Sequence, residues 1–128
     1  MKKSRVLNAL TALANETRLD IVRWLVPCGT AGMSAGDIAR KAHMSASRLS
    51  FHLTVLESAG LITSRKQSRH VFYRLDHRAL GAVMSYMLND CCRADPRIWG
   101  CIPGTDVLAA PTGRAPEIPV RGKSDPGP

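Results

Sequence analysis

Hydrophobic residues recur at intervals of three and four positions through the first half of the chain, which is the spacing that places them on one face of a helix. Asn15, Ser34 and Ser45 stand just before such segments, where their side chains can cap a helix N-terminus. Pro27 and Gly60 stand just after two of them, where these residue types end helices. Four helices are therefore predicted, over residues 4–14, 16–26, 35–42 and 46–59.

The pattern beyond the fourth helix is that of β-strands. Two short apolar runs, 61–63 and 71–74, flank the polar and basic segment 65–69, which predicts a β-hairpin with a basic loop at its tip. A last helix is expected over residues 77–91. Its hydrophobic residues exceed what the core of a small domain needs, so part of its surface is expected to meet a partner. The predicted fold class is mainly α with a small β-hairpin wing.

The balance of charge favours an anionic partner. The chain has 18 Lys and Arg against 10 Asp and Glu, a net charge of +8, and basic residues bind nucleic acid by displacing the counterions condensed on its phosphates. A solvated basic surface would give the same charge, so composition alone does not decide between the two. No apolar run reaches the ~18 residues of a membrane span, and no signal-peptide pattern follows Met1, so a cytoplasmic location is expected.

The order of the predicted elements narrows the anionic partner to DNA. Two helices joined by a tight turn and followed by a basic hairpin form an arrangement in which the second helix of the pair, 46–59, enters the major groove. The hairpin then contacts the backbone beside it. Solvated side chains would also be polar at these positions, but the combination of helix pair and basic hairpin favours DNA binding. The candidate DNA-binding residues are Ser45, Ser47, Arg48, Ser50 and His52 of the helix and Arg65, Lys66 and Arg69 of the hairpin.

Three stretches within residues 6–90 carry a resemblance to a known family: 12–21 (ALANETRLDI), 49–62 (LSFHLTVLESAGLI) and 73–75 (YRL). They are similar to the ArsR/SmtB family of metal-sensing repressors, whose fold is a dimeric winged helix-turn-helix. The resemblance implies a homodimer built by the first and last helices, with two recognition helices on a pseudo-palindromic operator. It also implies dissociation from the DNA when a metal or metalloid binds.

Three of the four cysteines, Cys91, Cys92 and Cys101, lie close together in the sequence. In a reducing compartment such a cluster is more often a ligand site than a disulfide framework. Thiolates are soft ligands that suit thiophilic centres such as trivalent arsenic, which takes three sulfurs. Adjacent residues on a regular helix point about 100° apart, so the Cys91–Cys92 pair can share one ion only where the helix loses its regularity, which the Asp95-Pro96 step favours.

The cluster also resembles the arsenite sensors of the family, whose ligands are a Cys-Cys pair at the end of the last helix and a cysteine soon after it. The implied effector is trivalent arsenic, and antimonite and methylarsenite are compatible with the same thiols. The cysteines that other members carry on the third helix are absent here, and the family's zinc-type site has only Asp76 and His77 of its ligands. Cys28 alone is more often a buried small residue than a ligand.

These considerations predict three parts of the chain. Residues 1–92 are expected to form the DNA-binding and dimerisation domain, 93–103 a ligand-binding loop, and 104–128 a disordered tail.

Two other functions use the same residues. A disulfide between Cys92 and Cys101 would make the protein a redox- or reactive-sulfur-sensing repressor of the same fold. An enzyme with Cys91 or Cys92 as nucleophile and His77 as base is not expected, because the sequence lacks a Gly-rich phosphate loop and paired carboxylates. The operator sequence and the preferred trivalent metalloid stay open at this point.

Overall fold

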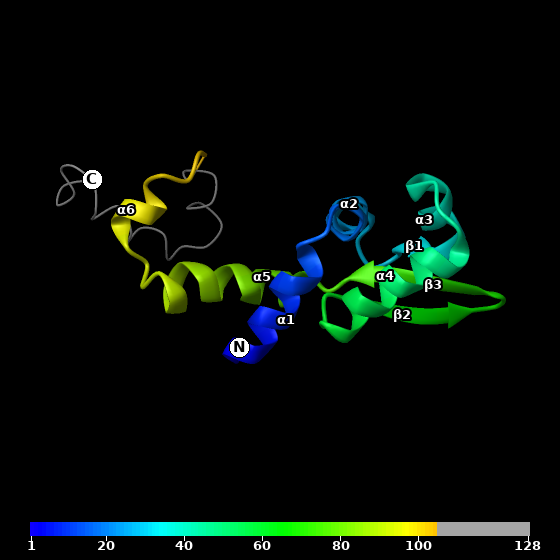
Figure 1. Cartoon of the computed structure of the whole chain (residues 1–128), viewed down its shortest axis with the longest axis horizontal. Coiled ribbons are helices and arrows are strands. Elements are labelled where there is room, and N and C mark those ends of the chain that lie inside the picture. The colour runs from blue at the N-terminus through cyan, green and yellow to red at the C-terminus, as the bar shows by residue number, and fades with distance from the viewer. Residues whose placement is uncertain (105–128) are drawn as a thin grey trace. The chain divides into compact units, whose positions relative to one another are not determined.

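The computed structural model describes residues 1–104 of the chain, so the expectation of a disordered tail concerns residues that lie, apart from Gly104, outside the described part. The chain divides into two compact units, residues 1–83 and 84–128, and each is considered by itself. Figure 1 shows the order of the elements along the chain.

The four helices predicted for the first unit are all present. They are α1 (Lys3–Leu13), α2 (Glu16–Leu25), α3 (Ala35–Ala42) and α4 (Ala46–Ser58). The predicted caps also form, because the side-chain oxygens of Asn15, Ser34 and Ser45 each accept the backbone N–H three residues further on, at 3.0, 3.1 and 3.3 Å. A short 3-10 helix, η1 (Val26–Cys28), follows α2.

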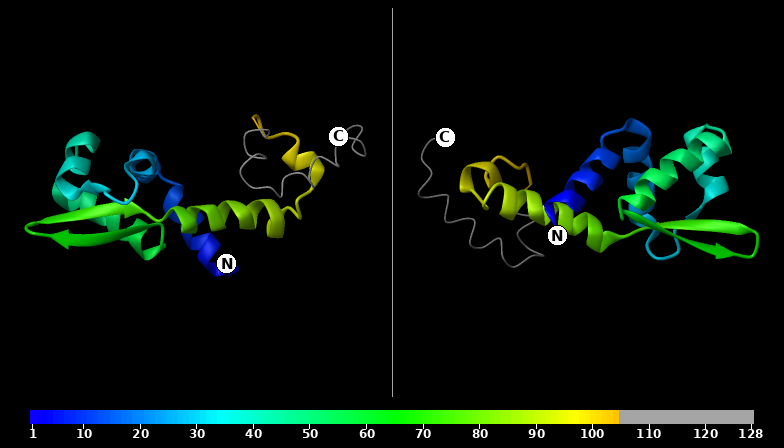
Figure 2. Two further views of the ribbon diagram at one scale, coloured as in Figure 1. Left: turned by 180° about the vertical axis from the view of Figure 1, so that it is seen from behind. Right: turned by 60° about the horizontal axis from the view of Figure 1, so that its bottom comes forward.

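The hairpin differs from its prediction. Strands β2 (Ile62–Gln67) and β3 (His70–Leu75) are antiparallel, with Arg65 opposite Phe72 and Lys66 opposite Val71. The expected basic loop 65–69 is therefore wrong, since residues 65–67 belong to a strand and the turn contains only Ser68 and Arg69. Backbone hydrogen bonds across the hairpin hold this polar segment extended without the alternation of apolar residues that marks a strand in a sequence. Figure 2 shows the hairpin extending beyond the helices of the first unit.

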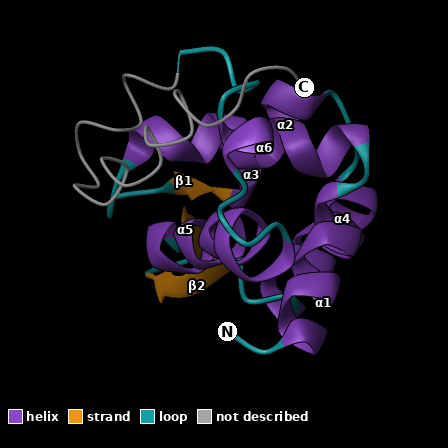
Figure 3. Ribbon diagram, turned by 90° about the vertical axis from the view of Figure 1, so that its left-hand side faces the viewer, coloured by secondary structure: helices purple, strands orange, loops and turns teal. Residues whose placement is uncertain are grey.

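A third, two-residue strand, β1 (Met33–Ser34), was not predicted. It pairs with β3 through Met33 opposite Tyr73 and Ser34 opposite Phe72, which gives a sheet of order β1-β3-β2. Helices α2 and α3 lie against β3, and α4 lies against β2. Helices α1 and α4 lie side by side (Figure 3).

The hydrophobic core of the first unit fills the space between these helices and the sheet. Its large members lie in the predicted helices and in the first predicted strand: Ile21, Leu25, Ile38, Leu49, Leu53, Leu56, Leu61 and Ile62. The fold is therefore mainly α with a small β wing, as predicted. Because three leucines of α4 are buried, the opposite side of that helix faces away from the core.

The second unit begins inside the last long helix. Helix α5 (His77–Ser85) continues as a π-helical segment, η2 (Tyr86–Cys91), so the helix predicted over 77–91 changes its geometry after Ser85. Arg93 and Ala94 then adopt left-handed backbone angles, with φ of 55° and 52°, and they turn the chain.

The segment 93–103 that was expected as a loop contains a short helix, α6 (Pro96–Trp99). Asp95 caps this helix by accepting the backbone N–H of Arg97 at 2.8 Å, and a proline is favourable at a first helical position. Trp99 is buried, with Leu88, Ala94 and Ile102 packed against it. The chain after α5 therefore forms a small hydrophobic cluster of its own.

Candidate nucleic-acid interface and cysteine cluster

The start of α4 and its N-cap expose four of the five residues that were expected to bind DNA from this helix. Ser45, Ser47, Arg48 and Ser50 are all exposed, and Ser45 also caps the helix through the backbone N–H of Arg48. Within residues 1–104, no side chain holds the guanidinium of Arg48 in a hydrogen bond or an ion pair. The start of α4 therefore presents small hydroxyl groups and one unengaged cation, which can bond phosphates or base edges.

His52 lies differently from the other helix candidates. Its ring is half-buried, and its Nδ1 lies 3.1 Å from Nη1 of Arg18 on α2. Nε of Arg18 donates at 2.7 Å to the carbonyl of Ala12, so one guanidinium joins the end of α1 to α4. Burial, and then the positive charges of Arg18 and Arg48, lower the pKa of His52. The structure therefore places His52 as a neutral acceptor that helps to fix α4. No local pattern indicates its partner, which lies 34 residues away in the sequence.

The lowered pKa of His52 gives the protein a pH-dependent stability. His52 has its ordinary pKa of 6.5 in the unfolded chain and a lower pKa in the folded protein, so below pH 6.5 the unfolded chain binds protons more readily. The contribution of neutral His52 to the free energy of unfolding is therefore present above pH 6.5 and is lost as the pH falls below it. We expect urea denaturation to give a smaller free energy of unfolding at about pH 5.5 than at about pH 7.5, and His52→Gln to reduce this difference. An equal pH dependence in both proteins would contradict the assignment.

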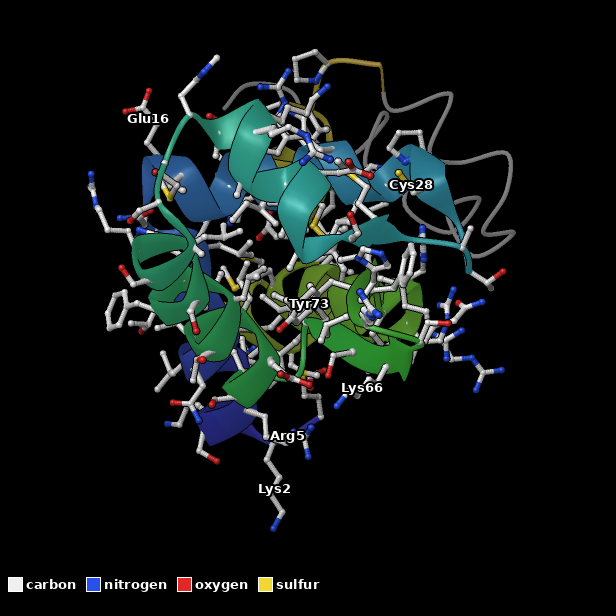
Figure 4. All side chains as sticks on the ribbon, turned by 90° about the vertical axis from the view of Figure 1, so that its right-hand side faces the viewer. Lys2, Arg5, Glu16, Cys28, Lys66 and Tyr73 are labelled. Atoms are coloured by element: carbon white, nitrogen blue, oxygen red, sulfur yellow. The ribbon has the colours of Figure 1, made fainter. Side chains whose placement is uncertain are left out.

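The basic residues of the hairpin are divided between its two faces, because neighbouring side chains of a strand point to opposite sides. Ser64 and Tyr73 mark the face toward α4, since the Ser64 hydroxyl donates to Oε2 of Glu57 at 2.8 Å. The pKa of Tyr73 is raised by burial and then by the charge of Glu57. Lys66 shares that face of β2, and Figure 4 shows its side chain extending outward while Tyr73 lies toward the middle of the domain.

Arg65 lies on the other face of the hairpin and is engaged within the protein. Its guanidinium donates to the carbonyls of Thr30 and Ala31 at 3.2 and 3.3 Å, and lies 5.2 Å from the ring centroid of Phe72. It therefore ties the hairpin to the loop before β1. Of the three predicted hairpin residues, Lys66 and the turn residue Arg69 are the ones with exposed and unengaged cations in the described part of the chain.

Cys91 and Cys92 come together at the end of η2. Cys91 is exposed and Cys92 is half-buried, and the backbone N–H of Cys92 donates to the carbonyl of Met87 at 3.1 Å, five residues back. A hydrogen bond with the Cys91 thiol, followed by burial and the negative charges of Cys91 and Asp95, raises the pKa of Cys92. Hydrogen bonds from Arg97 hold the pKa of Asp95 at about 2, so that carboxylate stays ionised.

Cys101 follows α6 and is exposed. No three His, Cys, Asp or Glu side chains among residues 1–104 are grouped so that they could hold a metal ion. The structure thus brings two of the three predicted thiols into contact and leaves the third outside that pair. The fourth cysteine, Cys28, donates through its Sγ to the carbonyl of Trp24 at 3.2 Å.

No helix in the described residues is both long enough and apolar enough to cross a membrane.

Comparisons with known proteins agree with this architecture. A family model described as a helix-turn-helix domain matches residues 13–65. The transcriptional activator HlyU of Vibrio cholerae is 34% identical over 86 residues, 67% of this chain and 77% of the relative. A structure of reduced HlyU from Vibrio cholerae N16961 matches with a TM-score of 0.55 at 31% identity, covering 65% of this chain and 85% of that one.

Two further matches bear on the family. The arsenical resistance operon repressor of Escherichia coli is 40% identical over 63 residues, which is 49% of this chain and 52% of the relative. The structure of an ArsR-like transcriptional regulator from Rhodococcus sp. RHA1 matches with a TM-score of 0.62 and 27% identity over 76% of this chain and 89% of that one. The chain belongs to the ArsR family of winged helix-turn-helix transcriptional regulators, which are DNA-binding proteins.

Proposed function

We propose that this protein is a transcriptional repressor that binds operator DNA as a homodimer and dissociates when trivalent arsenic is bound by Cys91, Cys92 and Cys101. The observation that carries the effector assignment is the packing of Trp99 against Leu88. This contact returns the chain after α6 toward the helix that ends in the Cys91–Cys92 pair.

The DNA-binding part of the proposal rests on α4 and the hairpin. The exposed face of α4 carries hydroxyl groups and Arg48, and the hairpin adds Lys66 and Arg69. Homodimerisation is supported by exposed hydrophobic side chains on the first and last long helices, since Leu7 of α1 is 55% exposed and Met84 of α5 is 58% exposed. Such side chains gain free energy by contact with a second copy.

The cluster around Trp99 supports a common site for the three thiols. Leu88 lies one helical turn before Cys91 and Cys92, while Trp99 and Ile102 flank Cys101. Because both flanking side chains belong to the cluster that includes Leu88, the peptide carrying Cys101 is tethered to the end of η2. We expect a movement of this exposed segment to bring Cys101 to the adjacent pair and to complete a three-sulfur site.

The chemistry of arsenite matches a site of neutral, reduced thiols. As(OH)₃ condenses with three thiols to form three As–S bonds, and three waters leave with the thiol protons, so no oxidant is consumed. Soft sulfur ligands select such a thiophilic centre over hard cations. The name of the Escherichia coli relative, an arsenical resistance operon repressor, adds support from outside the chain.

Release of DNA follows from the place of the thiols. Joining Cys101 to the end of η2 changes the helix that continues from α5, and so alters the packing of the dimer and the spacing of its two α4 helices. A dimeric helix-turn-helix protein needs half-sites about one helical turn apart, so the altered spacing disfavours the DNA-bound form.

The test is a DNA-release titration with arsenite under reducing conditions, on the wild type and on the Cys91→Ser, Cys92→Ser and Cys101→Ser variants. We expect the wild type to release a palindromic operator fragment and the three variants to stay bound. Cys28→Ser is the matched control, because Cys28 is bonded to a backbone carbonyl of the first unit, and it should respond as the wild type does. Undiminished release by all three variants would refute the arsenic site.

Methylarsenite separates two versions of this site, because it can be held by two thiolates. Retained release of Cys101→Ser by methylarsenite, together with loss in Cys91→Ser and Cys92→Ser, would indicate a site built on the adjacent pair alone.

A redox-sensing repressor is the second candidate, and two observations favour it. Cys101 is an exposed thiol, and the related HlyU has been solved in a reduced form. In this mechanism hydrogen peroxide oxidises Cys92 and Cys101 to a disulfide while it is reduced to two waters. DNA release by peroxide without arsenite, lost in Cys92→Ser and Cys101→Ser and kept in Cys91→Ser, would identify this function instead.

A further inference from the structure

Phe51 is the most exposed large hydrophobic side chain in residues 1–104, at 62% of its surface. If such a ring is buried when a partner binds, the binding constant increases about 10- to 100-fold. A single exposed hydrophobic residue on an arbitrary surface needs no partner. Phe51, however, lies on α4, the helix that the proposed function places in the major groove, and the inference below rests on that placement.

The position of Phe51 on α4 aims it away from the protein. At about 100° per residue, Phe51 lies about 200° around the helix from Leu49, whose side chain is buried in the core. Its neighbours along the helix face, three or four residues away, include Ser47 and Thr54, which are exposed, and Val55, which is half-buried. Phe51 is therefore the large central side chain of the face that would meet the floor of the groove.

The ring of Phe51 is also supported from one side. It meets the ring of His52 edge-on, with centroids 5.4 Å apart and an interplanar angle of 69°. His52 is itself held by Arg18 at 3.1 Å. This chain of contacts restricts the orientations of Phe51 before DNA arrives, which lowers the entropy lost on binding.

The chemistry of the major groove identifies what such a ring can recognise. Base edges there are hydrogen-bond donors and acceptors, apart from one apolar group, the C5-methyl of thymine. A phenyl ring against any of the polar edges would strip water from them without replacing its hydrogen bonds. We propose that Phe51 makes the protein select thymine at one position of each half-site by packing against the thymine methyl group.

The experiment removes that methyl group alone. A preferred duplex is first selected from a random library with the wild type, and each thymine is then replaced in turn by deoxyuridine, which keeps the Watson–Crick pairing. We expect one symmetric position at which deoxyuridine weakens wild-type binding about fourfold per half-site, the value of one buried methyl group. Phe51→Ala should bind thymine and deoxyuridine equally at that position, and Phe51→Leu should retain part of the preference.

Leu19→Ala is the matched control variant. It also shortens an exposed hydrophobic side chain, 48% exposed, but on α2, so it should keep the wild-type response to deoxyuridine. Sequence-specific binding in which no position distinguishes Phe51→Ala from the wild type would overturn the role of Phe51 and leave the proposed function standing. Failure of the wild type to select any duplex would overturn both.

Discussion

The Gly32→Ala variant is expected to lose about 2–4 kcal/mol of its free energy of unfolding. Gly32 has a φ of +71°, and a Cβ built on it would lie 2.1 Å from the carbonyl oxygen of Tyr73 and 2.9 Å from its carbonyl carbon. The obstacle is backbone, in the middle of the sheet, where Tyr73 pairs with both Met33 and Ser64. The chain can accept the methyl group only by separating β1 from β3.

Gly29→Ala is the control for this substitution. Gly29 also has a left-handed φ, +58°, but no atom lies within 4 Å of the position of its Cβ. Its ψ is −144°, and its alanine variant should therefore show only the cost of an unfavourable backbone conformation, about 1–3 kcal/mol. Urea denaturation of both variants measures the difference, and equal losses would mean that the close approach of Gly32 to Tyr73 is not a constraint of the fold.

The Arg48→Ala variant is expected to lose most of its affinity for operator DNA while keeping its stability. Arg48 is exposed at the start of α4, and its guanidinium has no hydrogen-bond or ion-pair partner in the described residues. A bidentate arginine contact to guanine is worth about 1–3 kcal/mol, which corresponds to roughly 5- to 150-fold in Kd for each half-site. Fluorescence anisotropy with a labelled duplex gives the affinity, and urea denaturation gives the stability.

Arg23→Ala provides the matched change of charge. Arg23 is exposed on α2 and pairs with Asp20 at 3.3 Å, so its removal alters the net charge equally without touching α4. Its affinity should fall by much less than that of Arg48→Ala. Equal losses of affinity in the two variants would mean that DNA binding depends on the net charge of the protein and that Arg48 makes no specific contact from α4.

The helices could be predicted because their signals are local. A hydrophobic spacing of three and four, with Ser34 and Ser45 at the N-termini, placed α3 over the residues that the structure assigns to it and α4 within one residue. The Asp95-Pro96 pair carries a similar signal, a cap followed by a first-position proline, and it could have revealed α6 within the segment expected as a loop.

The sheet could be predicted only in part, because strand pairing depends on partners far apart in the sequence. β1 has two residues, too few to show an alternation, and it is a strand only through its pairing with β3. Residues 65–67 are polar on both faces, so no hydrophobic pattern extended β2 over them. Hairpin register depends on the turn, and a two-residue turn moves basic residues from a loop into a strand.

In the candidate site, too, features with a local signal could be predicted, whereas contacts between residues far apart in the sequence could not. The exposure of Arg48 and Lys66 followed from helical spacing and a basic hairpin. The engagement of Arg65 with Thr30, and of His52 with Arg18, depends on contacts across 35 and 34 residues. The packing of Trp99 against Leu88 likewise depends on two left-handed residues, Arg93 and Ala94, which are not glycines and gave no turn signal.

If one protein couples DNA binding to a thiol ligand, calorimetric titration of arsenite with and without saturating operator will detect that coupling. Linkage is reciprocal, so operator DNA must weaken arsenite binding by the same factor by which arsenite weakens DNA binding. The corresponding coupling free energy is typically about 1–3 kcal/mol. We expect a weaker arsenite affinity in the presence of operator, with the two factors equal. The same arsenite affinity with and without operator would contradict this coupling.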